Sequence, residues 1–294
     1  MKPGGVRRRL DTELVRRGLT SSRDRARALV EGGHVLVGGA QADKAARLVR
    51  HDEPLEVLDD ASERFVSRGG DKLDAALTRF AVDVAGRRCL DAGASTGGFT
   101  DCLLRRGAAS VVAVDVGYGQ LHPRLRHDGR VTVRERTNVR ALRAADLPGG
   151  RVELVVCDLS FISLTVVAPV LLGELALPGA DVLALVKPQF EAGRAEVSRG
   201  RGVVRRPGAR LEALRAVASA FASQRASIMG AMASPVLGPA GNAEFFIHAR
   251  TWSSGPAAPD GGRGDEDLEA VLAAAVEAAP ARRAGPGPAP GGGR

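Results

Sequence analysis

The most informative run in this sequence is Leu90-Asp91-Ala92-Gly93-Ala94-Ser95-Thr96-Gly97-Gly98-Phe99-Thr100. The apolar residues from Cys89 to Ala92 predict a strand, and the glycines after them predict a tight turn into a helix. Glycine lets a ligand approach the backbone closely, and the first turn of a helix offers unpaired N–H groups. The run therefore predicts a ligand-binding strand-turn-helix unit. The alternative is a turn that serves only the fold.

The spacing of the glycines narrows the class of ligand. G-x-x-x-G-G differs from the G-x-G-x-x-G of dinucleotide sites, and no Gly-Lys-Ser/Thr is present for a nucleoside triphosphate. Asp115 ends the next predicted strand, where a carboxylate can bind both hydroxyls of a ribose. These features favour an adenosine ligand with few phosphates, such as S-adenosylmethionine. Gly97 and Gly98 are expected where the ligand lies close to the backbone.

Short apolar runs alternate with helical patterns around this unit and predict one sheet. The runs are Cys89–Ala92, Val111–Asp115, Val131–Arg134, Leu154–Cys157 and Val182–Lys187. Such strands, separated by helices, are typical of a parallel sheet with helices on both faces. Two further runs, Ser227–Ala233 and Glu244–Ala249, predict an antiparallel hairpin that closes the sheet. The fold class is therefore α/β, with a mostly parallel, seven-stranded, Rossmann-like sheet.

Charged residues lie at the ends of several of these elements. Asp158 and Lys187 each end an apolar strand, and the carboxyl ends of parallel strands meet at the edge where such sheets bind ligands. Lys72 lies in a predicted helix over 71–81, and Glu244 begins the last strand. Taken singly, Lys72 and Glu244 are typical of a surface salt bridge. Opposite charges at adjacent strand ends, however, predict a polar site.

A small basic module precedes the sheet. Residues 9–58 contain two helix patterns followed by strand patterns, which predicts a small α+β domain. Residues 1–50 hold twelve Lys and Arg against five Asp and Glu, and the whole chain carries a net charge of +8. Such a balance favours a polyanionic partner, usually nucleic acid. The alternative is that the charge serves only solubility.

Composition excludes several other classes of protein. Hydrophobic residues make up 44% and charged residues 26%, as in globular proteins. The basic start has no apolar segment after it, so no secretory signal is expected, and the apolar stretch 164–186 contains charges and prolines that disfavour a membrane span. The three cysteines lack C-x-x-C spacing, which predicts neither a zinc site nor a disulfide framework. We expect a cytoplasmic protein without a metal.

Longer motifs resemble a known family. The runs LDAGASTGGFTD, AVDVGYGQL, ERTNVR, DLSFISL, LVKPQFE and GPAGNAEFF are similar to those of the TlyA family. The run RLDTELVRRGLTSSRDRA resembles the S-four-type RNA-binding domain. The four charged residues resemble the Lys-Asp-Lys-Glu tetrad of FtsJ-like ribose 2′-O-methyltransferases; they are Lys72, Asp158, Lys187 and Glu244.

The resemblance implies an organisation and an activity. The expected parts are an S-four-type RNA-binding domain (1–63), an interdomain linker (64–70), an FtsJ-like methyltransferase domain (71–252), and a linker, short helix and low-complexity tail (253–294). S-adenosylmethionine is the implied methyl donor, and cytidine 2′-hydroxyls of ribosomal RNA within ribosomal subunits are the implied acceptors. No membrane partner is expected, and we expect a monomer. The family has also carried a haemolysin name.

The resemblance also implies roles for individual residues. The implied cofactor-binding residues are Gly93, Ser95, Thr96, Gly97, Gly98, Asp115 and Asn138, and the implied RNA-binding residues are Arg7, Arg9, Arg23 and Lys44. Lys187 would act at the 2′-hydroxyl, either as a base or as a cation that stabilises the alkoxide, with Asp158 orienting it. Lys72 and Glu244 would pair and hold the target ribose. Two alternatives stay open: a non-catalytic RNA-binding protein and a membrane-lytic protein.

Overall fold

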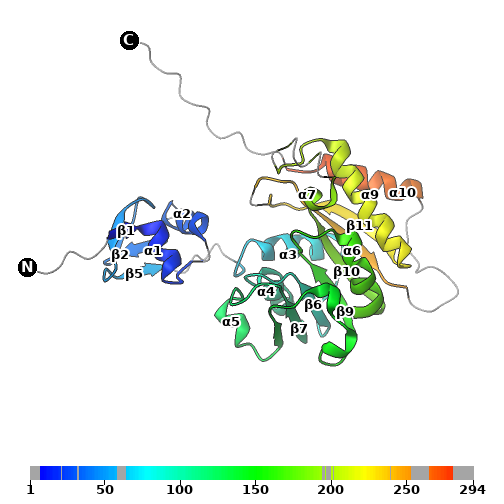
Figure 1. Cartoon of the computed structure of the whole chain (residues 1–294), viewed down its shortest axis with the longest axis horizontal. Helices are drawn as coiled ribbons and strands as arrows, with labels where there is room; N and C mark the ends of the chain where they lie inside the picture. The colour runs from blue at the N-terminus through cyan, green and yellow to red at the C-terminus, as the bar shows by residue number, and fades with distance from the viewer. Residues whose placement is uncertain are drawn as a thin grey trace, which may run out of the picture. The chain divides into compact units, whose positions relative to one another are not determined.

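The chain forms two compact units, Met1–Arg64 and Phe65–Arg294, which are described separately (Figure 1). The computed structural model describes residues 7–20, 22–31, 33–57, 64–193, 196, 200, 202–238, 240–252 and 265–280. Of the predicted C-terminal segment 253–294, only residues 265–280 are among these residues, and the end of the predicted RNA-binding domain at 58–63 lies outside them.

The first unit combines two helices with short antiparallel strands. Its elements are β1 (Arg7–Arg9), α1 (Leu10–Arg16), α2 (Arg23–Glu31), β2 (Val35–Val37), β3 (Ala40–Gln41), β4 (Leu48–Arg50) and β5 (Leu55–Val57). β1 pairs with β4, and β2 pairs with β3 and β5. Leu10 and Leu14 lie about one helical turn apart and are fully buried in a core that also contains Val35. The predicted α+β module is confirmed.

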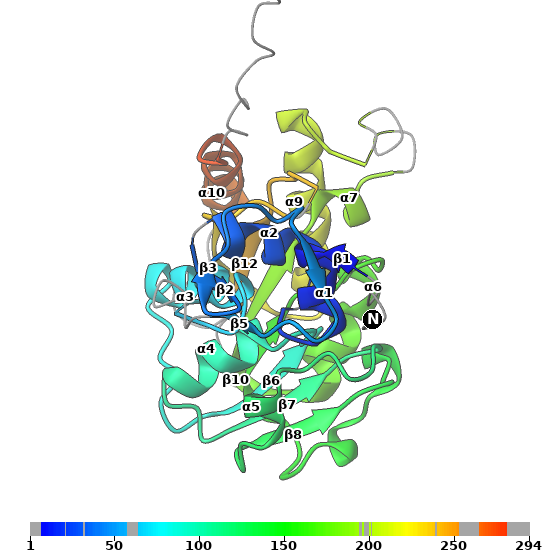
Figure 2. The same cartoon turned by 90° about the vertical axis from the view of Figure 1, so that its left-hand side faces the viewer.

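The second unit contains the predicted seven-stranded sheet. Its strands are β6 (Arg88–Ala92), β7 (Ser110–Val114), β8 (Val131–Arg134), β9 (Val152–Cys157), β10 (Ala176–Val186), β11 (Ser227–Ala233) and β12 (Phe245–Arg250). Their order is β11-β12-β10-β9-β6-β7-β8, and the five strands from β10 to β8 are parallel. β12 runs antiparallel to both β10 and β11, as the predicted hairpin requires. Figure 2 shows β6, β7 and β8 side by side.

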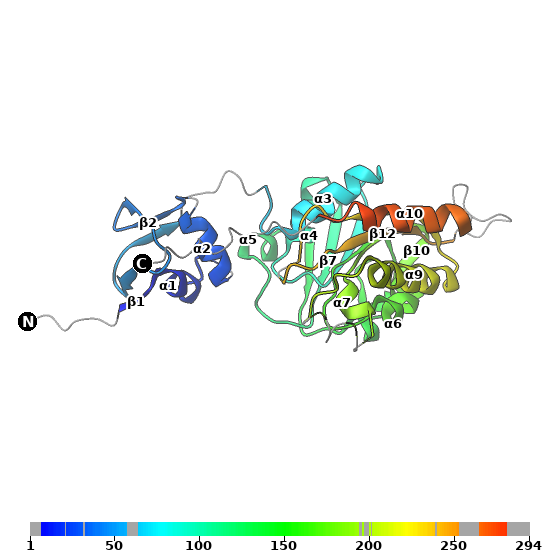
Figure 3. The same cartoon turned by 90° about the horizontal axis from the view of Figure 1, so that it is seen from above.

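Helices cover both faces of this sheet (Figure 3). The helical elements are α3 (Gly69–Arg79), α4 (Gly98–Arg105), α5 (Pro123–Arg126), η1 (Val139–Ala141), η2 (Ala144–Asp146), α6 (Leu164–Ala168), η3 (Pro169–Leu175), α7 (Pro188–Glu191), α9 (Pro207–Ser223) and α10 (Asp265–Glu277). α3 and α4 pack on one face through residues such as Leu73 and Leu103, while α6 and α9 pack on the other through Leu164 and Phe221. α10 packs against β11 and α9. Within the described chain, no helix has both the length and the apolar character needed to cross a bilayer.

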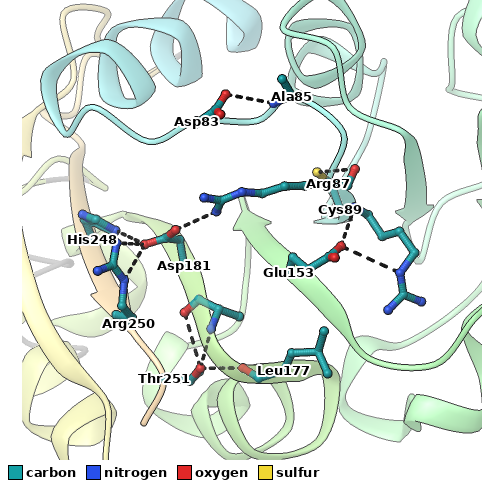
Figure 4. A network of polar contacts seen from close by, with 12 residues as sticks. Asp83, Ala85, Arg87, Cys89, Glu153, Leu177, Asp181, His248, Arg250 and Thr251 are labelled. Atoms are coloured by element: carbon teal, nitrogen blue, oxygen red, sulfur yellow. Dashed lines mark hydrogen bonds and ion pairs between the residues drawn. The ribbon is translucent and has the colours of Figure 1, made fainter. Parts of the chain in front are cut away.

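A buried carboxylate fixes the antiparallel part of the sheet (Figure 4). Asp181 on β10 lies 2.8 Å from His248 Nε2 and 3.0 Å from Arg250 Nη2, both on β12. It also accepts a 2.7 Å hydrogen bond from Arg87, just ahead of β6. Burial raises the pKa of Asp181, but hydrogen bonds from His248 and Arg87 outweigh it and hold that pKa below its usual range. The network therefore ties β12 to the parallel strands.

Candidate active site

A cavity of about 620 Å³ opens at the carboxyl ends of β6, β7, β8 and β9. It is lined by backbone and side chains of the loops that follow these strands, including four of the predicted cofactor residues: Gly93, Ser95, Asp115 and Asn138. Thr96, Gly97 and Gly98 are not among its lining residues. A second cavity of about 580 Å³, between the start of β10 and Trp252, contains none of the predicted site residues. The first cavity, and not the second, is therefore the candidate binding site for the predicted cofactor.

The backbone of two loops orients the carboxylate of Asp115. Its Oδ2 accepts a 2.8 Å hydrogen bond from the Ser95 amide, and its Oδ1 accepts one of 2.7 Å from the Gly117 amide. Each carboxylate oxygen has a second lone pair that can accept from a ligand hydroxyl. On the same cavity wall, Asn138 caps η1 by accepting from the Arg140 amide at 3.0 Å. Both side chains are therefore held in place before any ligand arrives.

The glycines of the loop after β6 serve two different purposes. Gly93 has a φ of 93°, and a Cβ there would lie 2.6 Å from the carbonyl oxygen of Asp158. A Cβ at Gly97 would overlap Leu121 and Leu125, near α5. One at Gly98 would lie 2.8 Å from the backbone nitrogen of Gly70 at the start of α3. Gly93 therefore shapes the cavity, whereas Gly97 and Gly98 let neighbouring segments pack closely.

Lys187 and Asp158 form the first of two ion pairs at this edge. Lys187 directly follows β10, and its Nζ lies 2.6 Å from Asp158 Oδ1 and 2.8 Å from Ser160 Oγ. Asp158 directly follows β9, and its amide donates to the Ala92 carbonyl at 2.9 Å, which continues the pairing of β9 with β6. Asp158 and Ser160 both line the cavity, so the ammonium group is held at its border.

Lys72 and Glu244 form the second ion pair. Lys72 Nζ on α3 lies 2.5 Å from Glu244 Oε2, and the two side chains are 8% and 1% exposed. Val186 of β10 pairs with Phe245 of β12, so Lys187 and Glu244 follow as neighbours at the ends of these strands. The two pairings expected from the sequence are thus present at one edge of the sheet, while the catalytic roles of the four residues stay predictions.

Asp91 is a buried carboxyl group for which the sequence patterns predict no role. It is fully buried on β6, one residue from its end, and accepts a 2.6 Å hydrogen bond from Thr100 Oγ1 on α4. Its other oxygen, Oδ1, has no hydrogen-bond partner among the described residues. Burial raises the pKa of Asp91 to about 7. This carboxyl group therefore titrates near neutral pH, directly ahead of the glycine loop.

Phe161 is a second residue that sequence patterns did not single out. It lines the cavity, yet it is 91% exposed and its φ is 64°, a left-handed conformation that costs free energy for a bulky residue. Its ring centroid lies 5.1 Å from that of Phe190, which follows Lys187 by three positions. Hydrophobic periodicity cannot reveal such a residue, because it belongs to no regular element and no core.

The predicted RNA-binding residues lie on segments that meet at the start of α1. Arg9 and Arg23 both form ion pairs with Asp11, at 2.7 and 3.5 Å. Arg7 and Lys44 are exposed, and Lys44 directly precedes Ala45, whose carbonyl accepts from the Asp11 amide at 3.0 Å. The structure thus places Arg9 and Arg23 around one carboxylate, that of Asp11, which no sequence pattern indicates.

Comparison with known proteins identifies related chains for both units. The FtsJ-like methyltransferase family matches residues 65–251, and the S4 domain family matches residues 8–54. A Mycobacterium tuberculosis protein named 16S/23S rRNA (cytidine-2′-O)-methyltransferase TlyA is 53% identical over 245 residues, covering 83% of this chain and 90% of that protein. YqxC of Bacillus subtilis, whose name marks it as a candidate rRNA methyltransferase, is 45% identical over 240 residues, covering 82% and 84%. A solved Streptococcus thermophilus structure with a hemolysin name has a TM-score of 0.71 and 35% identity, covering 93% and 97%.

Proposed function

The chain belongs to the FtsJ-like methyltransferases, and within them to the TlyA family, and on this premise we propose that it transfers a methyl group from S-adenosylmethionine to the 2′-hydroxyl of cytidine in ribosomal RNA. The observation that carries the proposal is the meeting of two lysine–carboxylate pairs at one sheet edge, beside the cavity. Buried charges are costly unless they are paired, and they concentrate at functional sites.

The residues that line the cavity fit S-adenosylmethionine. The volume of about 620 Å³ lies within the range of small-molecule sites, roughly 300–1,000 Å³. Asp115 would accept hydrogen bonds from the two ribose hydroxyls, and Asn138 would lie near the adenine. Gly93 and Ser95 would border the methionine part. When bound, the cofactor supplies a methyl group activated by the neighbouring sulfonium charge.

Lys187 would act on the ribose hydroxyl of the RNA. A hydroxyl group is a weak nucleophile until its proton leaves, so a group at the 2′-oxygen must accept that proton or stabilise the alkoxide that forms. Lys187 Nζ forms an ion pair with Asp158 Oδ1 at 2.6 Å, and Ser160 Oγ lies 2.8 Å from the same nitrogen. We therefore favour the ammonium as an electrostatic stabiliser of the developing alkoxide.

The remaining groups would hold the target nucleotide. The buried pair of Lys72 and Glu244 gives the ribose both a donor and an acceptor beside Lys187. The exposed ring of Phe161 offers a flat surface on which a nucleobase can stack, an interaction worth about 1–3 kcal/mol per base. Stacking would hold an unpaired base at the cavity mouth, so that its ribose faces the two ion pairs.

The first unit would bring the enzyme to its substrate. Its match to the S4 domain family and its exposed arginines support contact with ribosomal RNA in ribosomal subunits. We propose that the protein acts as a monomer in the cytoplasm, where these subunits occur.

Incubation with labelled S-adenosylmethionine tests this function directly. Purified small and large ribosomal subunits that lack the modification are offered separately, and the labelled nucleotide is mapped. We expect label on the ribose of a cytidine. Binding to subunits without transfer of label would instead favour a non-catalytic RNA-binding protein. Release of dye from lipid vesicles by the purified chain, without RNA, would favour a membrane-lytic one.

A further inference from the structure

Three arginines of the first unit surround one buried carboxylate. The side chain of Asp11 is fully buried. Arg9 binds it with two hydrogen bonds, Nε to Oδ1 at 3.0 Å and Nη2 to Oδ2 at 2.7 Å. Arg23 and Arg27 approach Oδ2 to 3.5 and 3.8 Å from α2. A residue of α1 thus gathers guanidinium groups from the end of β1 and from one side of α2.

The carboxylate is held by more than these arginines. Its Oδ1 also accepts a 3.1 Å hydrogen bond from Thr12 Oγ1, and the backbone amide of Asp11 donates to Ala45. The hydrogen bonds from Arg9 lower the pKa of Asp11 to about 2, so the group is ionised at neutral pH. Asp11 is therefore a fixed negative point around which the longer arginine side chains are arranged.

The cluster retains donors and positive charge for a further anion. Three guanidinium groups and one carboxylate leave a net charge of plus two. The arginine side chains are about half exposed, with 41% for Arg9, 54% for Arg23 and 49% for Arg27. Arg9 uses only two of its five N–H groups on Asp11. A guanidinium group held in place also loses less side-chain entropy when it binds.

We infer that Arg9, Asp11, Arg23 and Arg27 form a phosphate clamp for the RNA backbone, in which Asp11 is a positioning residue and Arg27 is a contact that the sequence did not indicate. The inference rests on the proposed function, because it assumes that the first unit binds ribosomal RNA. Guanidinium groups match phosphate oxygens in shape and charge. Asp11 would not touch the RNA; it would hold the arginines at a spacing that one phosphate group can bridge.

Removal of the Asp11 charge separates this inference from simple attraction between charges. If the unit bound RNA only through its net charge, Asp11→Asn would add one positive charge and tighten binding. If Asp11 positions the arginines, the same substitution weakens binding, by roughly 3–10-fold for a loss of about 1 kcal/mol. Asp52→Asn is the matched control, since it removes the same charge from a side chain that is 78% exposed.

The binding experiment uses the full chain and purified, unmodified large ribosomal subunits at several salt concentrations. We expect weaker binding for Asp11→Asn, and unchanged or slightly tighter binding for Asp52→Asn. In a variant that already carries Arg23→Ala, Asp11→Asn should weaken RNA binding by a smaller factor than in the wild type. Asp11 can no longer act through Arg23 when that side chain is absent. A purely structural role would give additive losses, and these would overturn the inference.

A second variant keeps the test valid if Asp11→Asn does not fold. Arg27→Ala should weaken binding and reduce the slope of log affinity against log salt by about 0.7–0.9, the value for one phosphate contact. Arg16→Ala is its control, because Arg16 also pairs with a buried carboxylate, Glu13, but lies outside the cluster around Asp11. Equal losses in both variants would exclude a clamp at Asp11. Failure of the wild-type chain to bind subunits would instead reject the proposed function, and the clamp with it.

Discussion

Lys187 is the residue at which the proposed chemistry is most directly tested. Lys187→Ala should lower the single-turnover rate of methyl transfer by about 10²–10⁴-fold, the range for a group that acts on the reacting oxygen as an acid–base or electrostatic catalyst. Lys187→Arg should not restore the rate, because the larger, planar guanidinium group spreads its charge and cannot place the compact charge of an ammonium at the 2′-oxygen. The affinities for S-adenosylmethionine and for rRNA should change little, since this amine would act mainly in the transition state. A near-normal rate for Lys187→Ala would rule out the mechanism.

Asp91 should make the stability of the second unit depend on pH. With a pKa of about 7 instead of the ordinary 3.8, the folded state keeps a proton that the unfolded chain releases between about pH 4 and pH 7. The contribution of this group to stability therefore falls as the pH rises through that window, and stays low above it.

Asp91→Asn cannot titrate, so the variant should gain stability relative to the wild type between pH 5 and pH 8. The expected relative gain is on the order of 1–3 kcal/mol. Urea unfolding followed by fluorescence of Trp252, the single tryptophan of the chain, reports on this unit. If the free energy of unfolding changes with pH in the same way in the wild type and in Asp91→Asn, Asp91 is not the titrating group.

At the scale of elements, the contact between α3 and α4 positions Lys72. Gly98→Ala would place a methyl group against Ser67 and the backbone of Gly70, and so push the start of α3 away from the glycine loop. We expect a loss of about 1–3 kcal/mol in stability, as for other overpacked sites, together with slower methyl transfer. Gly129→Ala is the control, because no described atom lies within 4 Å of a Cβ at that position. Similar melting temperatures and rates for the two variants would contradict this account.

Elements with a long apolar pattern could be predicted from the sequence, and shorter ones could not. The seven strands of the large sheet were predicted because runs such as Val152–Cys157 are apolar and bounded by turn residues. β1 and β4 were missed, because three residues that include arginines, such as Arg7–Arg9, show no alternation. β10 starts earlier than predicted, at Ala176, since its first part contains Pro178 and Gly179, which normally indicate a turn.

The same limit applies to the candidate site. Residues at strand ends, such as Asp158 and Lys187, could be predicted because the order of a parallel sheet brings its carboxyl ends together. The partners of Asp11 depend on how α1, α2 and β1 pack, and the exposure of Phe161 depends on a loop conformation. Neither is a periodic property, so a sequence without its fold does not reveal them.

At the scale of the whole molecule, the two units should divide recognition from chemistry. Removal of residues 1–63 should abolish methylation of ribosomal subunits, because the basic unit that binds RNA is lost. The affinity for S-adenosylmethionine should remain, since the cavity is lined entirely by residues of the second unit. Calorimetry measures the affinity of the shortened chain for S-adenosylmethionine, and transfer of label measures its methylation of ribosomal subunits. Methylation at the full-length rate by the shortened chain would contradict this division.

The packing of α10 on β11 has a consequence for the solubility of the chain. β11 is an edge strand of the seven-stranded sheet, and Leu272 and Val276 of α10 are buried in the core on that side. An exposed edge strand beside an uncovered apolar surface is a template for pairing with another copy of the protein. A chain that ends before Asp265 should therefore aggregate as its concentration rises, even though every residue proposed for binding and catalysis is still present. α10 would then protect the chain from self-association by covering this side of the sheet, although it contributes no residue to the lining of the cavity.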